Sequence, residues 1–265
     1  MNNNHQKSVV IADGISKSYG SVKALTPLSF QVQTGERVAL AGPSGSGKTT
    51  LLYLLAGIIQ PDEGRLYING QLLSGLQPGR ELSQLVGTIH QQYDLVPHLP
   101  VIQNVLAGRL GQWGLLRSLI SLVWPQDRHL AETALSRLGI ADKVYQRTSH
   151  LSGGEKQRVA IARVMVQSPS VVLADEPVAS LDPARAEEML RLLIDLTASA
   201  GKTLIVSLHS PYLIQKYCSR IIGLRSGQMA FDLPSSEVTE RLLDQLYDLD
   251  HQSQESVPEV CSPVS

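Results

Sequence analysis

A glycine-rich segment at residues 42–49 contains the residue types that hold a polyphosphate. Its letters, GPSGSGKT, fill the pattern GxxxxGKS/T. Glycines let the backbone wrap around phosphate groups, so that successive N–H groups point inward as donors. Lys48 can reach the outer phosphates, and the hydroxyl of Thr49 can ligate Mg²⁺. We therefore expect the chain to bind a nucleoside triphosphate. The expected contacts are Gly42, Pro43, Ser44, Gly45, Ser46, Gly47, Lys48, Thr49 and Thr50.

The residues on either side of this segment predict the elements that must position it. Residues 37–41 are a short apolar run that predicts a strand, and residues 50–56 predict a helix. A helix that begins near Lys48 directs its positive dipole end at bound phosphates. A flexible glycine–serine linker could match the same letters by chance, but the flanking strand and helix favour the phosphate loop.

Two adjacent carboxylates end another apolar run. Residues 171–174 predict a strand, and Asp175 and Glu176 follow it directly. Ligands of open α/β sheets bind at the carboxyl ends of the strands. Because adjacent strand residues point to opposite sides, the two acids are expected to have different roles. Asp175 suits the Mg²⁺ shell, and Glu176 can be directed at an attacking water molecule.

A second glycine-containing turn, residues 151–155, precedes a helix predicted at residues 156–166. Glycines ahead of a helix N-terminus can form an anion site. Two such loops are redundant for one nucleotide within a monomer, but they make sense if two copies meet head to tail and each loop closes over the other copy's nucleotide. A helix cap explains the same letters, because Ser152 with Glu155 three residues later matches a capping box. Both interpretations stay open at this point.

Length, composition and charge limit the class of protein. The chain has 265 residues, 43% of them apolar, which suffices for one large domain or a core with a subdomain. Its 23 basic and 24 acidic residues leave no strongly basic field for nucleic acid. The two cysteines, Cys218 and Cys261, fit no metal spacing and suit a reducing compartment. The N-terminus is polar, and the most apolar stretch, residues 115–124, is too short to cross a bilayer. We therefore expect a soluble protein that reaches a membrane through a partner.

The strand and helix patterns predict an α/β core that a helical block interrupts. Early strand-like runs with turn signals predict antiparallel strands that lean on the core. Later runs alternate with helical patterns and predict a parallel sheet. The strand-like runs are residues 9–12, 28–32, 65–68, 171–174, 204–208 and 221–224. We expect a nucleotide-binding core at residues 1–92 and 166–247, a helical subdomain at residues 93–165 and a disordered tail at residues 248–265.

Five features in this order resemble the nucleotide-binding subunits of ABC transporters. They are residues 42–49, 151–155, 173–176 and 180–182, followed by His209. The resemblance covers about residues 8 to 247. It implies the ABC ATPase type of α/β fold, which is a P-loop NTPase (RecA-like) core with an antiparallel β subdomain and an inserted helical subdomain. It also implies an ATP hydrolase that uses ATP and Mg²⁺.

The same resemblance implies partners. A second ATPase subunit would complete a homodimer with two ATP molecules at its interface, beneath two transmembrane permease subunits. A periplasmic solute-binding protein would take part indirectly, and nucleic acid is not expected. These partners imply a peripheral position on the cytoplasmic face of the plasma (inner) membrane.

The resemblance assigns roles to single residues of the core. Tyr19 matches the aromatic residue on which adenine stacks. Gln91 matches the glutamine that contacts Mg²⁺ and the attacking water while linking to the membrane subunits. His209 follows the strand predicted at residues 204–208, where it can bond both the γ-phosphate and Glu176. The implied catalytic set is Lys48, Gln91, Glu176 and His209, and the implied Mg²⁺ ligands are Thr49, Gln91 and Asp175.

The second glycine-containing turn also gains a role from the resemblance. Ser152, Gly153 and Gly154 would act in trans, on the nucleotide of the partner subunit. Asp182 resembles the interface aspartate that couples the two sites. One departure is Glu155, where the commonest form of this signature has glutamine. Glutamate adds a charge and loses two donors, so we expect it to tune the interface rather than abolish it. An isolated monomer is expected to bind ATP but barely hydrolyse it.

Further segments look like the ATP-binding subunits of phosphonate importers. They are residues 104–111, 113, 116–119, 173–183 and 217–225. This resemblance implies uptake of phosphonates or of a related phosphorus oxyanion, such as phosphite or phosphate. Two alternatives stay open, a soluble ATPase accessory to a phosphonate-degrading complex and an importer ATPase for another small solute. Nucleic-acid and translation ABC proteins usually have tandem ATPase halves or a long coiled-coil insertion, which this chain lacks.

Overall fold

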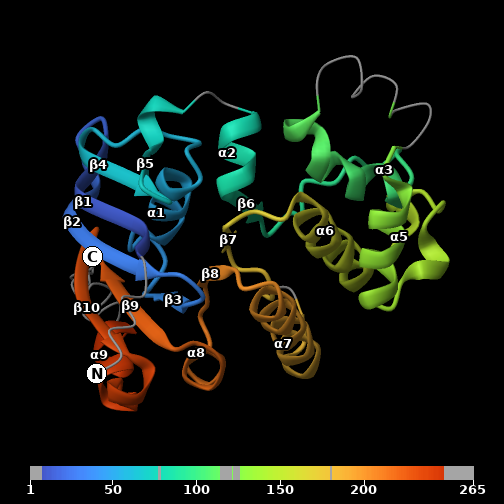
Figure 1. Ribbon diagram of the computed structural model, residues 1–265. Coiled ribbons are helices and arrows are strands. Elements are labelled where there is room, and N and C mark those ends of the chain that lie inside the picture. The colour runs from blue at the N-terminus through green and yellow to red at the C-terminus, as the bar shows by residue number, and fades with distance from the viewer. Residues whose placement is uncertain (1–7, 77–78, 114–120, 122–125, 180, 248–265) are drawn as a thin grey trace, which may run out of the picture.

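A six-stranded sheet forms the centre of the protein (Figure 1). The computed structural model describes residues 8–76, 79–113, 121, 126–179 and 181–247. The strand order is β10-β9-β3-β8-β7-β6, and β10 is an antiparallel edge on otherwise parallel strands. The bounds are β3 Arg37–Ala41, β6 Val86–Ile89, β7 Val171–Ala174, β8 Thr203–Ser207, β9 Arg220–Arg225 and β10 Gln228–Pro234. All residues of β7 and β8 are buried, as expected for parallel strands covered on both faces.

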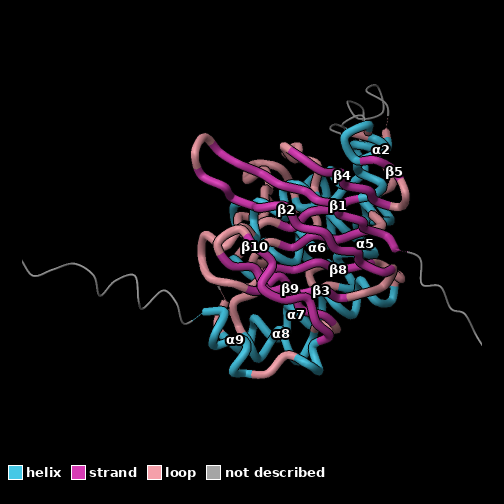
Figure 2. The backbone as a smooth tube through the Cα atoms, turned by 90° about the vertical axis from the view of Figure 1, so that its left-hand side faces the viewer, coloured by secondary structure: helices cyan, strands magenta, loops and turns pink. Residues whose placement is uncertain are grey.

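A four-stranded antiparallel sheet has the order β2-β1-β4-β5. In the view of Figure 2 its strands lie above β3, β8 and β9. The bounds are β1 Ser8–Tyr19, β2 Val22–Gln33, β4 Glu63–Ile68 and β5 Gln71–Leu72. Its inner face shares one apolar cluster with the helix α1 (Lys48–Leu55), in which Val10, Ile15 and Leu51 are fully buried. The early strands predicted at residues 9–12, 28–32 and 65–68 therefore lie where expected.

Helices of the middle of the chain pack on one another beside the large sheet. They are α3 (Val101–Leu106), α5 (Arg128–Arg137) and α6 (Gly153–Gln167), which contact each other pairwise. Ala134, Leu135 and Leu138, on one side of the α5 segment, are buried in the apolar cluster that these helices share. A short helix, α2 (Arg80–Leu85), precedes β6. Figure 1 shows α6 apart from α1, with α2 and β6 between them in this view.

Helices of the C-terminal part of the chain cover the face of the large sheet that lies opposite α1 and the antiparallel sheet. Three helices belong to it, α7 (Pro183–Ser199), α8 (Pro211–Tyr217) and α9 (Glu240–Tyr247). Leu190, Ile214 and Leu243 bury their side chains in the apolar cluster that also contains α3, α5 and α6. Among the helices that the structure describes, none is long and apolar enough to cross a membrane.

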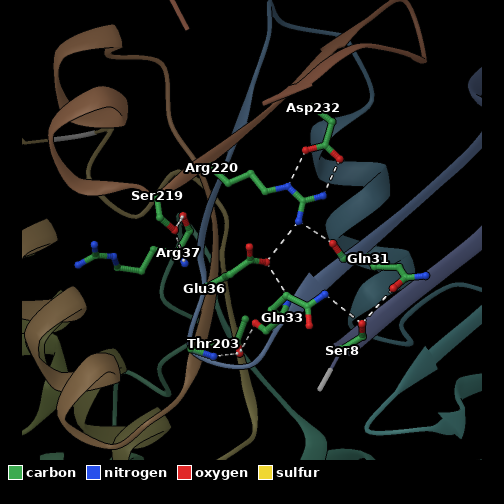
Figure 3. A network of polar contacts seen from close by, with 10 residues as sticks. Ser8, Gln31, Gln33, Glu36, Arg37, Thr203, Ser219, Arg220 and Asp232 are labelled. Carbon is green, nitrogen blue, oxygen red and sulfur yellow. Dashed lines mark hydrogen bonds and ion pairs between the residues drawn. The ribbon is translucent and has the colours of Figure 1, made fainter. Parts of the chain in front are cut away.

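A polar network ties the turn between β2 and β3 to the strands β9 and β10 (Figure 3). Arg220 donates two hydrogen bonds of 2.6 Å to the carboxylate of Asp232 and one of 2.7 Å to the carbonyl of Gln31. Its guanidinium also lies 3.3 Å from Glu36. The bidentate bond to Asp232 raises the pKa of Arg220. Planar bidentate pairs of this kind fix geometry strongly, so the network holds the start of β3 and therefore the base of the phosphate-binding segment.

Candidate nucleotide-binding site

The loop between β3 and α1 has the backbone of a phosphate cradle. Gly42, Gly45 and Gly47 have φ angles of 145°, 78° and 103°, which favour glycine. A Cβ at Gly42 would lie 2.1 Å from the carbonyl oxygen of Leu224, and one at Gly47 would lie 2.6 Å from Leu25. The chain therefore needs glycine at these two positions for its own packing.

Lys48 folds back into the loop. Its Nζ donates to the carbonyl oxygens of Gly42 at 2.7 Å and Pro43 at 2.9 Å, and only 6% of the residue is exposed. Burial lowers the pKa of Lys48, while the charges of Glu176 and Asp175 act against that shift. Ser46 in the same loop is 1% exposed, and its buried hydroxyl has no hydrogen-bond partner among the described residues. A buried ammonium and an unpaired hydroxyl inside a glycine-rich loop fit a site for an anionic ligand.

Ser207 at the end of β8 holds both carboxylates that follow β7. Its Oγ donates to Asp175 Oδ1 at 2.7 Å and accepts from the backbone N–H of Glu176 at 2.8 Å. Glu176 adopts a left-handed φ of 46°, a conformation that is rare for residues other than glycine and is typical of functional sites. The serine thus orients Asp175 and fixes the backbone at the point where Glu176 turns.

His209 and Glu176 lie side by side, as the sequence predicts. The Nε2 of His209 lies 2.6 Å from Glu176 Oε1. His209 follows β8, and Glu176 follows the neighbouring strand β7, so the sheet itself brings the two together. Both residues line a cavity of about 440 Å³ bordered by residues of α7 and α8. An imidazole in contact with a carboxylate can orient that carboxylate and exchange a proton with it.

The residues expected to hold Mg²⁺ border one hollow. Thr49, Gln91 and Asp175 line it together with Tyr53 and His90. In the part of the chain that the structure describes, no group of three or more His, Cys, Asp or Glu residues could hold a metal ion. A hydroxyl, an amide and a carboxylate supply oxygen ligands. Mg²⁺ prefers oxygen and binds through few protein groups, together with water and substrate phosphates. The donor set therefore fits Mg²⁺.

Tyr19 and Asp182 lie at exposed positions outside the loop. Tyr19 ends β1 at the turn into β2, with half of its surface exposed and Lys17 Nζ 5.9 Å from its ring centre. Asp182 is the N-cap of α7, where its Oδ1 accepts from the backbone N–H of Arg185 at 3.1 Å. An exposed aromatic ring can stack on a base. Ser180, which precedes this cap, lies outside the described residues.

The second glycine-containing turn forms a capping box at the start of α6. The hydroxyl of Ser152 accepts from the N–H of Glu155, and the Glu155 carboxylate accepts from the N–H and the hydroxyl of Ser152 at 2.8 Å each. The cap does not explain the two glycines, because a Cβ at Gly153 or Gly154 would meet nothing within 4 Å. The glycines of this turn therefore serve no packing purpose among the described residues.

Sequence reasoning missed two positions that support the site. Ser207 is one, and the other is Arg163 of α6, which donates to the carbonyls of Tyr93 at 2.9 Å and Asp94 at 2.7 Å. Tyr93 and Asp94 both have left-handed φ angles, 62° and 46°, in the turn that follows Gln91. Arg163 thus joins α6 to the turn that carries the glutamine. Its position in the apolar spacing of α6 marks it as a partly buried charge, which is the signal that could have found it.

Known proteins similar to this chain belong to one family. Residues 25–179 match a family model described as ABC transporter. The phosphonates import ATP-binding protein PhnC of Pseudomonas putida is 46% identical over 236 residues, 88% of each chain. The phosphonates import ATP-binding protein PhnC 1 of Pseudomonas aeruginosa is 47% identical over 227 residues, 85% of each chain.

Solved structures share the fold. The ADP conformation of MJ1267, an ATP-binding cassette of an ABC transporter, has a TM-score of 0.79 at 25% identity and covers 94% of this chain and 100% of its own. A dimeric post-hydrolysis state of the cassette MJ0796 bound to ADP and Pi has a TM-score of 0.71 at 29% identity, covering 85% and 98%. The predicted ABC ATPase fold is confirmed. With a family match over more than half of its length and relatives nearly half identical across most of both sequences, the chain belongs to the ABC transporter family.

Proposed function

We propose that this chain is the ATP-hydrolysing subunit of an importer, which energises the uptake of phosphonates or a related phosphorus oxyanion such as phosphite or phosphate. The observation that carries the cargo class is the identity of 46% and 47%, over most of both chains, to two phosphonates import ATP-binding proteins. This subunit reaches the membrane through two permease subunits and works on its cytoplasmic face. A periplasmic solute-binding protein delivers the cargo and does not contact the chain.

The core half of the site is suited to phosphoryl transfer. Lys48 leaves the loop carbonyls for the outer phosphates, since charged phosphate oxygens are stronger acceptors for an ammonium than carbonyls are. Glu176 orients a water molecule or accepts its proton, and His209 holds the carboxylate in place from 2.6 Å away. Thr49, Gln91 and Asp175 would hold Mg²⁺, which supplies positive charge against the phosphate oxygens. Tyr19 stacks on adenine.

The other half of the site belongs to a second copy of the chain. Ser152 and Gly153 are exposed, and the space beside Gly153 and Gly154 is open. This openness supports a turn that lies against the partner's nucleotide, where a side chain would be in the way. Two structures of one similar cassette, MJ0796, are dimeric. Asp182, exposed at the start of α7, couples the two sites, and an isolated monomer binds ATP but barely hydrolyses it.

The helical block carries the signal to the permease. Arg163 of α6 bonds the turn that follows Gln91. A change at the nucleotide that shifts this turn therefore moves α6 with it. We place the moving subdomain at residues 93–165 and the core at residues 1–92 and 166–247. The tail proposed at residues 248–265 lies outside the described residues.

Uptake in cells that lack the chromosomal gene tests the cargo. Wild-type chain on a plasmid should restore the uptake of radiolabelled methylphosphonate, and Glu176→Gln should not. Unlabelled phosphite and phosphate, added in turn, rank the competing oxyanions. Methylphosphonate uptake that is unchanged by loss of the gene would refute the phosphonate assignment. Co-purification with a polytopic membrane protein separates an importer from a soluble accessory of a phosphonate-degrading complex, which would purify without one.

A further inference from the structure

The last described helix ends against the first glycine of the phosphate loop. Tyr247 closes α9, and its hydroxyl oxygen accepts from the backbone N–H of Gly42 at 3.2 Å, across 205 positions of sequence. Resting on the proposed binding of ATP, we propose that Tyr247 is a positioning residue of the phosphate loop, through which α9 sets the affinity for nucleoside triphosphate.

Three groups outside the glycines of the loop, namely the side chains of Tyr247 and Lys48 and the N–H of Gly227, hold its backbone. Tyr247 holds the N–H of Gly42, Lys48 holds its carbonyl oxygen at 2.7 Å, and the N–H of Gly227 donates to the carbonyl of Ser46 at 3.1 Å. Gly42 is therefore held on both of its peptide groups. Because Lys48 turns to the phosphates when ATP binds, its bond to Gly42 is lost at that moment. The bond from Gly42 to Tyr247 is then the side-chain contact that keeps the start of the loop in place.

Tyr247 is well placed to act as an anchor because α9 is docked firmly. Leu243 and Leu246 on one face of the helix are 1% and 3% exposed and lie in the main apolar core, together with Val238 just before the helix. Gln215 of α8 donates to the carbonyl of Val238 at 3.1 Å, which fixes the approach to α9. A tyrosine on a packed helix loses little freedom on bonding a loop, so the bond orders the loop rather than the helix.

The chemistry of the hydroxyl suits this role. Burial raises the pKa of Tyr247, while the bond from Gly42 acts in the opposite direction. The hydroxyl therefore stays neutral at physiological pH and accepts from Gly42 N–H without adding negative charge to a site for an anion. A carboxylate at the same place would repel the phosphates. The bond preorganises the loop, and a preorganised loop has less conformational entropy to lose when ATP binds.

Removal of the hydroxyl tests the proposal. Tyr247→Phe keeps the ring and its packing, and Tyr217→Phe is the matched control, since Tyr217 is also half-buried and donates to Glu187 of α7 at 2.8 Å, away from the loop. We expect Tyr247→Phe to weaken the binding of a fluorescent ATP analogue about three- to tenfold, the loss of roughly one hydrogen bond. The KM for ATP should rise by a similar factor, with kcat near that of the wild type. Tyr217→Phe should change neither the affinity for the ATP analogue nor the KM for ATP.

Hydrogen exchange at the Gly42 amide separates positioning from general destabilisation. Tyr247→Phe should speed exchange there about threefold or more, with no change at β8 or α6. Equal ATP affinity and equal Gly42 exchange in wild type and variant would overturn the proposal while leaving ATP binding intact. A wild-type chain that binds no ATP would overturn the proposed function and this inference together.

Discussion

The phosphate loop and the turn before α6 are both glycine-containing entries into a helix, but the structure uses their glycines differently. A Cβ at Gly42 would lie 2.1 Å from a backbone carbonyl, whereas a Cβ at Gly153 or Gly154 would meet nothing within 4 Å. The first loop needs glycine for packing within the chain. The second turn keeps its surface clear, which has a use only when something outside the chain approaches it.

The polar side chains of the phosphate loop and of the turn before α6 differ in the same way as their glycines. Lys48 is buried and bonded to its own loop, and its surroundings contain the carboxylates that the chemistry requires. Ser152 is exposed, and its bonds to Glu155 serve the helix end. The residues proposed for the chemistry thus lie together within the chain, whereas the contacts that the second turn makes within the chain are those of a helix cap. The difference shows that a cap and a binding role are compatible readings of the same residues.

Glu176→Gln gives the largest expected effect and tests whether the core half supplies the chemistry. Glutamine has nearly the same shape but cannot accept a proton from water, so turnover should fall by about 10²–10⁴. ATP affinity should stay near the wild-type value, because Lys48 and the loop are untouched. Steady-state ATPase and equilibrium binding measure the two effects. Glu187→Gln is the control, since Glu187 borders the same cavity but is bonded to Lys216 at 2.6 Å. Near-normal ATPase in Glu176→Gln would exclude this role.

Gly154→Ala tests the open half. We expect unchanged thermal stability and ATP affinity, with ATPase lower by roughly a hundredfold, which is the cost of about 1 Å of misplacement between the two halves. Gly42→Ala is the counterpart in the crowded half and should lose ATP binding, because its Cβ collides with the Leu224 carbonyl. An equal loss of ATP binding in Gly154→Ala would remove the contrast between the two loops.

Mixing variants shows whether the two halves come from different chains. In a mixed dimer of Gly154→Ala and Glu176→Gln, one site combines the intact core of the first chain with the intact turn of the second. Random mixing should therefore restore about a quarter of wild-type ATPase from two inactive variants. No recovery at a concentration that supports wild-type activity would indicate that each chain acts alone.

The elements of the core could be predicted because their signals are local. The strands at residues 171–174 and 204–208 are continuous apolar runs, and the loop at residues 42–49 needs glycine for reasons of backbone geometry. The pairing of Glu176 with His209 was predicted from the resemblance and from the positions of both residues at strand ends. Their roles in catalysis stay predictions, as do the Mg²⁺ ligands and the contacts in trans.

The supporting residues could not be predicted because they depend on the register between distant segments. Ala174 pairs with Val206 in the parallel ladder, which places the next residues, Asp175 and Ser207, beside each other. Neither the strand order nor this register follows from the letters of one strand. Arg163 and Tyr247 likewise bond backbone groups, which any sequence offers, so no particular partner residue marks the contact. The local hints are a polar residue within an otherwise buried strand, as with Ser207, and a charge within the apolar spacing of a helix, as with Arg163.

Glu155→Gln gives the smallest expected effect and tests whether Glu155 serves only the start of α6. Hydrogen bonds from the backbone N–H and the hydroxyl of Ser152 lower the pKa of Glu155, with desolvation acting against them. A lowered folded-state pKa means that the charge stabilises the protein above the ordinary glutamate pKa of about 4.3, and that this contribution is lost as the pH falls through the folded value. At pH 7 the variant should lose about 0.3–1 kcal/mol of stability, the usual value of a charge at a helix N-terminus. Once the pH has fallen below the lowered folded-state pKa of Glu155, the two proteins should unfold alike.

The ATPase of Glu155→Gln decides whether this residue belongs to the cap or to the nucleotide site. Glutamine keeps an oxygen that can accept from Ser152, so the turn should hold its shape and ATPase should stay within about twofold of wild type. Thermal unfolding at pH 7 and at a pH below the folded-state pKa of Glu155, with ATPase at saturating ATP, measures both effects. A tenfold change in ATPase without the pH-dependent stability difference would place the Glu155 charge against the partner's phosphates.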